Sequence, residues 1–328
     1  MGKPLFLALA LLAACALPMW PAQAELAPTA AQRALRSLLV DVATAGNRLV
    51  AVGARGQILY SDDQGRNWQL ADSPTQVLLT AVFFADPQHG WAVGHDAQVL
   101  ATVDGGSHWT LQRQAPEREA PLLDVWFANA QRGIAIGAYG ELLATEDGGA
   151  HWEEAGARLD NPDQLHLNAI SASGDGNLFI VGEQGGLFRS RDQGLTWERL
   201  DSPYQGSFFG VLATHAPGTL LVYGLRGNVL RSTDSGDSWQ AVTIVGGQGA
   251  LDSGLAGGAL LADGALVIVG NGGTVLYSQD DGATFSSRTR PDRQALAAVA
   301  QAPGGNLWLV GQGGARQAQP TELTERMR

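Results

Sequence analysis

The sequence predicts an all-β protein, a seven-bladed β-propeller whose blades are four-stranded antiparallel sheets, and three observations predict it. An element of the form apolar-Gly-x-x-Gly recurs seven times, with 41 to 46 residues between successive first glycines by difference of their numbers. A second element, Ser/Thr-x-Asp-x-Gly-x-x-aromatic, recurs six times. Glycine is abundant at 43 of 328 residues, and charged residues reach only 16%, as expected of many short strands joined by tight turns.

The first element gives the number of blades. An apolar strand, a short turn and a second apolar strand precede each copy, as in residues 38–42 and 49–52, and an alternating strand such as 57–60 follows. The period of two in these runs indicates strands. Seven such units, each unable to bury both faces alone, predict a ring. The first glycines are Gly53, Gly94, Gly137, Gly182, Gly224, Gly270 and Gly311.

The second element follows the third strand in the first six copies and resembles the Asp-box, also called the bacterial neuraminidase repeat. Its aspartate is expected to accept hydrogen bonds from its own turn, its glycine to take a positive φ, and its aromatic residue to pack between neighbouring sheets. Evenly spaced carboxylates would lie around a rim, so they are interpreted as structural. The residues are Asp63, Trp68, Asp104, Trp109, Asp147, Trp152, Asp192, Trp197, Asp234, Trp239, Asp280 and Phe285.

The two chain ends are predicted to close the ring. The seventh copy has a short strand at residues 315–317 and then no Asp-box, so one outer strand is missing. The segment from Leu26 to Ser37 stands just before the first copy and is predicted to supply that strand. A single domain is therefore predicted over residues 25–328, with repeats over about 38–314 and a polar tail over 318–328.

The first 24 residues are typical of a signal peptide. Lys3 is followed by an apolar stretch and by Ala22-Gln23-Ala24, a small-x-small cleavage site. Residues 12–15 also resemble a lipobox ending in Cys15. The sequence therefore predicts an exported, periplasmic protein, with lipid anchoring through Cys15 as the alternative. Cleavage after Ala24 would leave no cysteine, which excludes disulfides and cysteine metal sites.

A candidate binding surface follows from the predicted topology. The turns between strands two and three share one face of a propeller with the linkers between blades, around the mouth of the central channel. The linkers contribute residues 117–119, 160–166, Tyr204 and 290–293 to that face. The candidate partner-binding residues of the turns are Arg55, His95, Asp96, Tyr139, Glu183, Arg226 and Asn271.

Catalytic patterns are weak in this sequence. No His-x-x-x-His spacing indicates a metal, so neither a metal nor a cofactor is predicted. His95-Asp96 is the pair most suited to ligation or proton transfer, and Asp96 with Glu183 could serve a hydrolase that uses two carboxylates. A sialidase would need three arginines and an opening Arg-Ile-Pro motif, which is absent. The net charge of −11 disfavours nucleic acid as a partner.

The combined repeat unit resembles the photosystem II assembly-factor-like propellers, over about residues 38–314. Residues 83–109 are the clearest copy, with Gly90-Trp91-Ala92-Val93-Gly94 leading to an Asp-box. The resemblance implies a non-enzymatic scaffold that binds membrane-protein subunits, and in a non-photosynthetic bacterium a role beside a membrane exporter. It also implies an arginine-rich face. Arg55 and Arg226 stand in the Gly-x-Arg-Gly position, where the other five copies have Ala97, Tyr139, Gln184, Gly272 and Gly313.

The predicted function is therefore that of an exported, monomeric, non-enzymatic scaffold that binds a membrane-associated protein partner through the channel face. The alternatives are a glycan-acting hydrolase, sialidase-like or of another Asp-box kind, and a sugar-binding lectin. Carboxylates and arginines that converge in a deep channel would favour the enzyme, whereas scattered aromatic and charged residues on a flat face would favour the scaffold.

Overall fold

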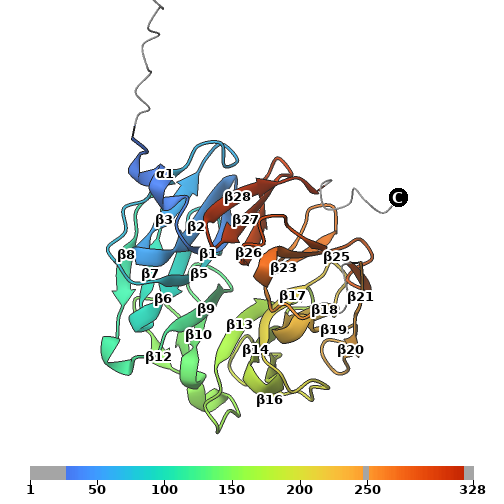
Figure 1. Ribbon diagram of the computed structural model, residues 1–328. Helices are drawn as coiled ribbons and strands as arrows, with labels where there is room; N and C mark the ends of the chain where they lie inside the picture. Colours follow the sequence, from blue (N-terminus) through green and yellow to red (C-terminus); the bar gives the residue numbers. More distant parts are fainter. Residues whose placement is uncertain (1–26, 247–250, 321–328) are drawn as a thin grey trace, which may run out of the picture.

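The computed structural model describes residues 27–246 and 251–320, and seven β-sheets follow one another around a central axis (Figure 1). The first and the last blade stand side by side, so the ring is closed. This arrangement confirms the predicted fold class. The predicted signal peptide, Cys15 and most of the polar tail lie outside the described residues. Within the described part of the chain, no helix is long and apolar enough to cross a membrane.

Blades 1 to 5 are four-stranded antiparallel sheets whose strands pair in chain order, with the first strand innermost. Blades 1 and 2 consist of β1 (Leu39–Ala45), β2 (Arg48–Gly53), β3 (Ile58–Ser61) and β4 (Gln69–Leu70), then β5 (Leu79–Phe84), β6 (Gly90–Gly94), β7 (Val99–Thr102) and β8 (Thr110–Arg113). Blades 3 and 4 consist of β9 (Leu122–Phe127), β10 (Gly133–Gly137), β11 (Leu142–Thr145) and β12 (Glu153–Glu154), then β13 (Leu167–Ala172), β14 (Leu178–Gly182), β15 (Leu187–Ser190) and β16 (Glu198–Arg199). Blade 5 consists of β17 (Phe208–Ala213), β18 (Leu220–Gly224), β19 (Val229–Ser232) and β20 (Gln240–Ala241).

Blade 6 has one strand more than the repeat predicts. Its antiparallel strands are β22 (Leu255–Leu260), β23 (Leu266–Gly270), β24 (Thr274–Ser278) and β25 (Thr284–Thr289). The additional strand, β21 (Thr243–Val245), comes from the linker after blade 5 and pairs with β25 in parallel. The unit that includes this linker has the widest glycine spacing in the chain, which leaves enough residues to cover the edge of the next blade.

Among the described residues, blade 7 has three strands, β26 (Leu296–Gln301), β27 (Leu307–Gly311) and β28 (Gly314–Ala318), as its missing Asp-box indicates. The prediction that residues 26–37 supply its fourth strand is wrong. Ala30–Ala34 form the short helix α1, because Thr29 and Gln32 make a capping box around an alanine-rich turn. The segment still joins the two ends, since the carbonyl oxygen of Leu35 accepts a hydrogen bond of 3.0 Å from the Ala315 N–H.

The Asp-box locks each outer hairpin as the sequence predicts. In blade 3, the Asp147 carboxylate accepts hydrogen bonds from the backbone N–H of His151 (2.9 Å) and from the Thr145 hydroxyl (2.9 Å), and it contacts the His151 ring (2.7 Å). These bonds, led by the His151 N–H, lower the pKa of Asp147 to about 2. Gly149 takes a φ of +92° and donates its N–H to Thr145. The Asp-box carboxylates are therefore already hydrogen-bonded within their own turns.

The aromatic residue of each Asp-box packs against the preceding blade. Trp109 of blade 2 joins a core cluster with Val50, Val52 and Ile58 of blade 1, and Phe285 of blade 6 packs on Leu221 of blade 5. Trp68 joins the cluster formed by blades 7 and 1. Six of the seven blade interfaces therefore contain a box aromatic, and only the interface of blades 6 and 7 lacks one.

Candidate functional site

The turns between the second and third strands have one repeated conformation in blades 1 to 6. Each is a single 3-10 turn, such as Ala54–Gly56, whose middle residue is in the left-handed region. The first glycine is needed for a close approach. A Cβ on Gly53 would lie 2.3 Å from the Leu38 carbonyl oxygen, because the chain enters the blade directly across it. The same approach recurs at all seven first glycines.

The linkers between blades lie against these turns, as predicted. The Ala115 N–H donates to the Asp96 carbonyl (2.8 Å), and the Tyr204 hydroxyl donates to the Leu225 carbonyl (3.1 Å). Turns and linkers thus form one surface at the end of the ring where every first strand begins. We call it the turn face, and it comprises the seven turns at residues 54–56, 95–97, 138–140, 183–185, 225–227, 271–273 and 312–313 with the adjoining linkers. The Asp-box hairpins lie on the opposite face.

The seven candidate residues all lie on the turn face but do not converge. Arg55, Asp96, Tyr139 and Arg226 occupy the left-handed middle position of their turns. The sequence pattern predicted Ala97 at the middle position of the blade 2 turn. The structure corrects this: Asp96 is the middle residue, and Ala97 replaces the second glycine of the repeat. The other three, His95, Glu183 and Asn271, each stand first in their turn.

The residue pairs considered for catalysis are not assembled into a site. Asp96 and Glu183 lie on blades 2 and 4, with blade 3 between them. Glu183 accepts the backbone N–H of His166 (3.0 Å), and the Nδ1 of His166 accepts the N–H of Tyr139 (2.9 Å), so these groups tie blades 3 and 4 together. Among the described residues, no three His, Cys, Asp or Glu side chains are grouped so that they could hold a metal ion.

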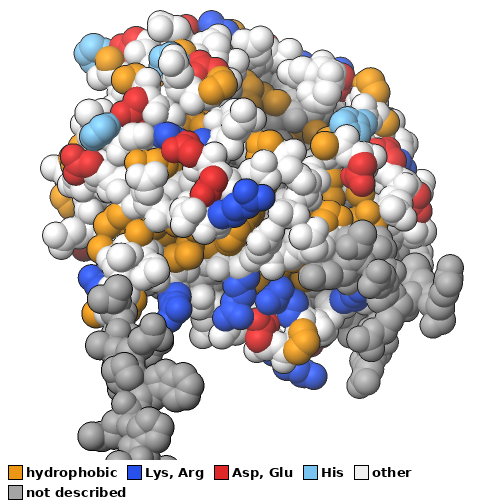
Figure 2. All heavy atoms as spheres, turned by 90° about the horizontal axis from the view of Figure 1, so that it is seen from above, with side chains coloured by type: hydrophobic (Ala, Val, Ile, Leu, Met, Phe, Trp, Pro, Cys, Tyr) orange, Lys and Arg blue, Asp and Glu red, His pale blue; other side chains and the backbone are white. Residues whose placement is uncertain are grey.

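A basic sector of the turn face spans blades 6, 7 and 1. We call it the arginine sector, and it consists of Arg36, Arg55, Arg290, Arg293 and Arg316. Gly314 lies against the backbone of Arg36, and the preceding Gly313 lies against the guanidinium of Arg316. Figure 2 shows arginine side chains gathered along one edge of the molecule.

Three arginines of this sector are free to bind. Arg290 and Arg316 share Asp292, each at 3.0 Å. Arg36, Arg55 and Arg293 have neither a hydrogen-bond nor an ion-pair partner for their side chains within residues 27–246 and 251–320. Leu38, beside Arg36 in the chain, is 44% exposed. The sequence drew attention to Arg55 and to residues 290–293, but Arg36 and Arg316 were missed because only the closed ring brings the chain ends together.

The rest of the turn face is acidic. The turns and linkers of blades 2 to 5 carry Asp96, Glu117, Glu119, Asp160, Asp163, Glu183, Asp201 and Asp252. Arg118 there is paired with Glu141 (2.8 Å) and with Glu154. Arg226, on blade 5, is not beside Arg55, because blade 5 borders blade 6 of the sector but not blade 1. The two turn arginines are therefore not brought together.

The central channel contains polar groups that the sequence analysis did not single out. A cavity of about 340 Å³ is lined by the first strands of all seven blades, and Asp41, Asp124 and Tyr223 reach it. Burial raises the pKa of Asp41 to about 6 and that of Asp124 to about 7, and the Asp41 charge adds to the second shift. Burial, with the charges of Asp124 and Asp41, raises the pKa of Tyr223. The sequence did contain a signal for these channel groups, namely an aspartate at the same position of an apolar strand in two repeats.

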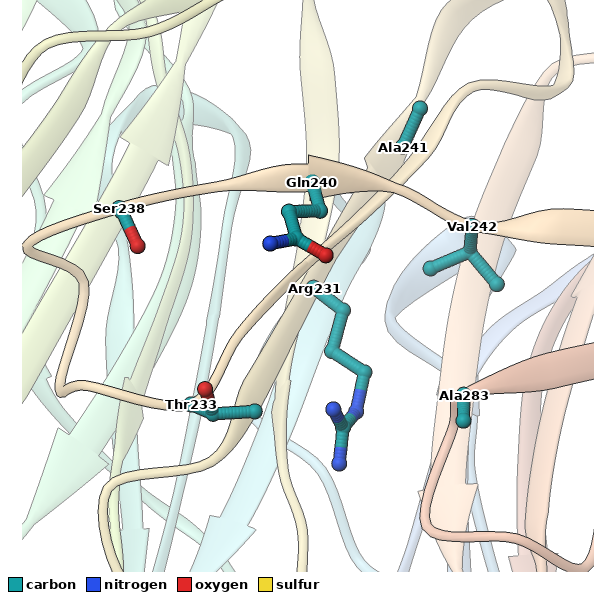
Figure 3. A pocket seen from close by; sticks show the side chains of 7 residues that line it. All are labelled: Arg231, Thr233, Ser238, Gln240, Ala241, Val242 and Ala283. Carbon is teal, nitrogen blue, oxygen red and sulfur yellow. The ribbon is translucent and has the colours of Figure 1, made fainter.

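A smaller pocket of about 130 Å³ lies at the rim between blades 5 and 6 (Figure 3). Arg231 lines it, but its guanidinium donates to the backbone carbonyl (2.9 Å) and to the carboxylate (3.0 Å) of Asp281. The Ser238 hydroxyl donates to the Asp234 carboxylate. Because its principal polar groups are already paired, this pocket is a packing feature of the rim.

Two family profiles match this chain. The profile of the family described as photosynthesis system II assembly factor YCF48 matches residues 66–120 and 111–326, and that of the BNR/Asp-box repeat matches residues 59–70. The photosystem II assembly protein Ycf48 of Synechococcus sp. (strain JA-2-3B'a(2-13)) is 36% identical over 143 residues, which are 42% of this chain and 41% of that protein. The photosystem II assembly lipoprotein Ycf48 of Synechococcus sp. (strain CC9902) is 30% identical over 250 residues, 75% of this chain and 60% of that protein.

The aligned part of the chain thus spans about four to six tenths of the length of these curated relatives. A solved structure described as YCF48 bound to D1 peptide superposes with a TM-score of 0.68 at 17% identity, covering 86% of this chain and 93% of that one. At this identity, the superposition supports the fold alone.

Proposed function

Because this chain belongs to the Ycf48 family of photosystem II assembly factors, we propose that it is a non-enzymatic, exported scaffold that binds a membrane-associated protein partner through its turn face. The arginine sector is the principal contact, and it takes an acidic or carboxylate-terminated segment of the partner. The protein acts as a monomer, and nucleic acid is not its partner.

One observation carries this proposal. Arg36, Arg55 and Arg293 lie in turns and linkers of the adjoining blades 6, 7 and 1, and their guanidinium groups have no partner among the described residues, in a chain whose net charge is −11. A guanidinium matches a carboxylate with two parallel hydrogen bonds, so unpaired arginines suit an acidic peptide better than a neutral one. The exposed Leu38 adds an apolar contact within the same sector.

The relatives support the same function. One structure is described as YCF48 bound to D1 peptide, which supports recognition of a peptide segment by a propeller of this fold. A second relative is described as an assembly lipoprotein, which supports an exported protein held at a membrane. Scaffolding is also favoured over glycan hydrolysis because Asp96 and Glu183, the carboxylates a hydrolase would use, are separated by a blade.

The test is capture from the native envelope. Tagged wild-type protein is incubated with detergent-solubilised envelope, and retained proteins are quantified by mass spectrometry. We expect a membrane protein to be enriched by the wild type and reduced about tenfold with Arg36→Glu/Arg55→Glu. The matched control, Arg66→Glu/Arg199→Glu, makes the same charge change at exposed residues outside the turn face and should retain the partner.

The two parts of the proposal fail in different ways. Equal retention by wild type and by Arg36→Glu/Arg55→Glu would show that the arginine sector is not the contact. Enrichment of no membrane protein over a tag-only control would overturn the scaffold function itself.

A further inference from the structure

We propose that the turn-face mouth of the central channel is a binding site for an alkylammonium group, held by the carboxylates of Asp41 and Asp124 and by the hydroxyl of Tyr223. This site is separate from the arginine sector, and it does not depend on which partner that sector binds. It would take a primary amine on an apolar stem.

The repeat makes the two aspartates conspicuous. The first strand of every blade has a β-bulge near its start, as between Leu39 and Asp41 in blade 1. The residue after the bulge is small in five blades and an aspartate in blades 1 and 3 only. These residues are Asp41, Ala81, Asp124, Ala169, Gly210, Gly257 and Ala298. Because Leu39 pairs with Gly53, the residue just before the turn at residues 54–56, the bulges lie at the turn-face end of the channel.

Each aspartate also links two blades. Asp41 accepts the N–H of Val42 in its own strand and that of Val82 in blade 2, both at 2.8 Å. Asp124 accepts the N–H of Val125 (2.8 Å) and that of Ile170 in blade 4 (2.9 Å). These bonds fix both carboxylates at the channel wall. Each oxygen accepts one N–H, so it keeps a second lone pair for a ligand.

Tyr223 is the independent indication of a ligand. Its side chain is only 3% exposed, and its hydroxyl has no hydrogen-bond partner among residues 27–246 and 251–320. The ring lies over Gly210, and the hydroxyl oxygen lies 2.9 Å from where a Cβ on Gly258 would be, so two glycines make room for it at the channel wall. The hydroxyl opens onto the cavity and is not itself enclosed by protein, so a group bound in the channel can pair with it.

The lining selects the class of ligand. Asp41, Asp124 and Tyr223 are the titratable side chains among the described residues that line the cavity, and no arginine or histidine faces them. The wall is otherwise largely aliphatic or aromatic, with Val40, Leu123 and Phe209 among its residues. Ca²⁺ or Mg²⁺ would need about six oxygen ligands, which this wall does not offer. An ammonium group with a short alkyl chain matches both the charge and the apolar wall.

The charge state of the site agrees with a cationic ligand. With no cation beside them, burial raises the pKa of Asp41 to about 6 and that of Asp124 to about 7. A bound ammonium would stabilise both ionised carboxylates and lower these pKa values. Binding should therefore be strong at about pH 8 and lost at about pH 5, where both groups hold a proton.

The test uses pentylammonium chloride and its neutral isostere pentanol, titrated calorimetrically into the wild-type protein. We expect saturable binding of pentylammonium at about pH 8, at least tenfold tighter than pentanol and tighter than at about pH 5. Asp41→Asn and Asp124→Asn should each weaken it about tenfold, and Tyr223→Phe about threefold. Asp263→Asn, at an exposed carboxylate on the opposite face, is the matched control and should leave binding unchanged.

The comparison of pentylammonium with pentanol in the wild-type protein tests the proposal even if a variant fails to fold. Equal binding of pentylammonium and pentanol, or no saturable binding of pentylammonium, would overturn it. A lysine-containing peptide and its norleucine counterpart then distinguish the source of the amine. Tighter binding of the lysine peptide than of free pentylammonium would indicate a partner's side chain, and binding of the free amine alone would indicate a small molecule.

Discussion

The indole N–H of Trp308, in the last blade, donates a hydrogen bond of 3.0 Å to the carbonyl oxygen of Gln64, in the first Asp-box hairpin, across 244 residues of sequence. The same relationship occurs between blades 2 and 3, where Trp91 donates to the Gly148 carbonyl at 3.0 Å. Trp308 also packs edge-on against Trp68, with ring centroids 5.2 Å apart. The interface that closes the ring is therefore built like an internal one, and helix α1 is added to it.

Removal of the Trp308 side chain should open this closing interface. Trp308→Ala deletes a buried indole and leaves a cavity beside Trp68, so we expect a loss of about 3–5 kcal/mol in the free energy of unfolding. Trp308→Phe keeps most of the apolar contact and should cost about 1 kcal/mol through the lost hydrogen bond. Urea unfolding measures both, with Val103→Ala at a 72% exposed residue as the control. Equal stability of Trp308→Ala and Val103→Ala would contradict this account of ring closure.

The regular parts of the fold could be predicted because the residues that determine each blade lie within its own repeat. The first glycine follows from a local close approach, and the Asp-box follows from hydrogen bonds within one hairpin. The closing strand was predicted wrongly because a missing strand says nothing about the conformation of its replacement, and the capping box of Thr29 and Gln32 favoured a helix. The linker strand β21 was missed because its parallel pairing with β25 has no repeat signature.

The candidate site was predicted in part for the same reason. Arg55 could be placed on the turn face from its position in a repeat. Arg36 and Arg316 lie outside the turns, and only closure of the ring brings these residues from the two chain ends together. Asp41 and Asp124 were missed because each lies within an apolar strand. Only the folded ring shows that these strands line the central channel.

The first glycine of each turn should be sensitive to a single methyl group. In Gly53→Ala the new Cβ would lie 2.3 Å from the Leu38 carbonyl oxygen and 2.7 Å from the Leu39 Cα, and both are backbone atoms that cannot move independently. We expect a loss of about 3 kcal/mol or more in the free energy of unfolding. Gly174→Ala, where a Cβ would have no atom within 4 Å, is the control and should change stability by less than about 0.5 kcal/mol. Similar unfolding midpoints for the two variants would refute the close-approach argument.

The box aromatics should contribute to stability according to their burial. Trp109 is 5% exposed, whereas Trp152 is only partly buried, and both pack between blades. Trp109→Ala should cost about 3–5 kcal/mol, and Trp152→Ala should lie near the lower end of that range. Thermal and urea unfolding measure both differences. An unchanged midpoint for Trp152→Ala would show that this indole does not support the interface between blades 2 and 3.

The channel carboxylates should make the protein less stable as the pH rises. Asp41 and Asp124 have raised pKa values in the folded state, about 6 and about 7, so the native protein holds more protons than the unfolded chain above about pH 4. Their contribution to stability therefore falls between about pH 4 and pH 7, and the loss above about pH 5 is on the order of 4 kcal/mol. The Asp-box carboxylates do not produce this slope, because lowered pKa values such as that of Asp147 matter only below about pH 4.

Asp124→Asn isolates that effect. The amide cannot titrate, so the difference in unfolding free energy between the wild type and Asp124→Asn should change with pH over this interval. The variant also loses one of the two backbone N–H acceptors at residue 124, which lowers stability at every pH without adding a slope. Urea unfolding at a series of pH values tests this. Parallel curves for the two proteins would mean that Asp124 does not titrate in the channel.

Arg55 and Arg226 hold the same position in two turns, yet the structure predicts different contributions to partner binding. Arg55 lies in the arginine sector beside Leu38 and Arg36, whereas Arg226 stands on blade 5 among acidic turns and linkers. Arg55→Glu should therefore weaken capture of the partner about tenfold, and Arg226→Glu should change it by less than about twofold. The double variant Arg55→Glu/Arg226→Glu should then bind no more weakly than Arg55→Glu. Neither substitution removes a side-chain bond to another described residue, so far-ultraviolet circular dichroism and unfolding midpoints should match the wild type. Equal losses from the two single variants would show that the partner contacts the whole rim of the turn face and not one sector.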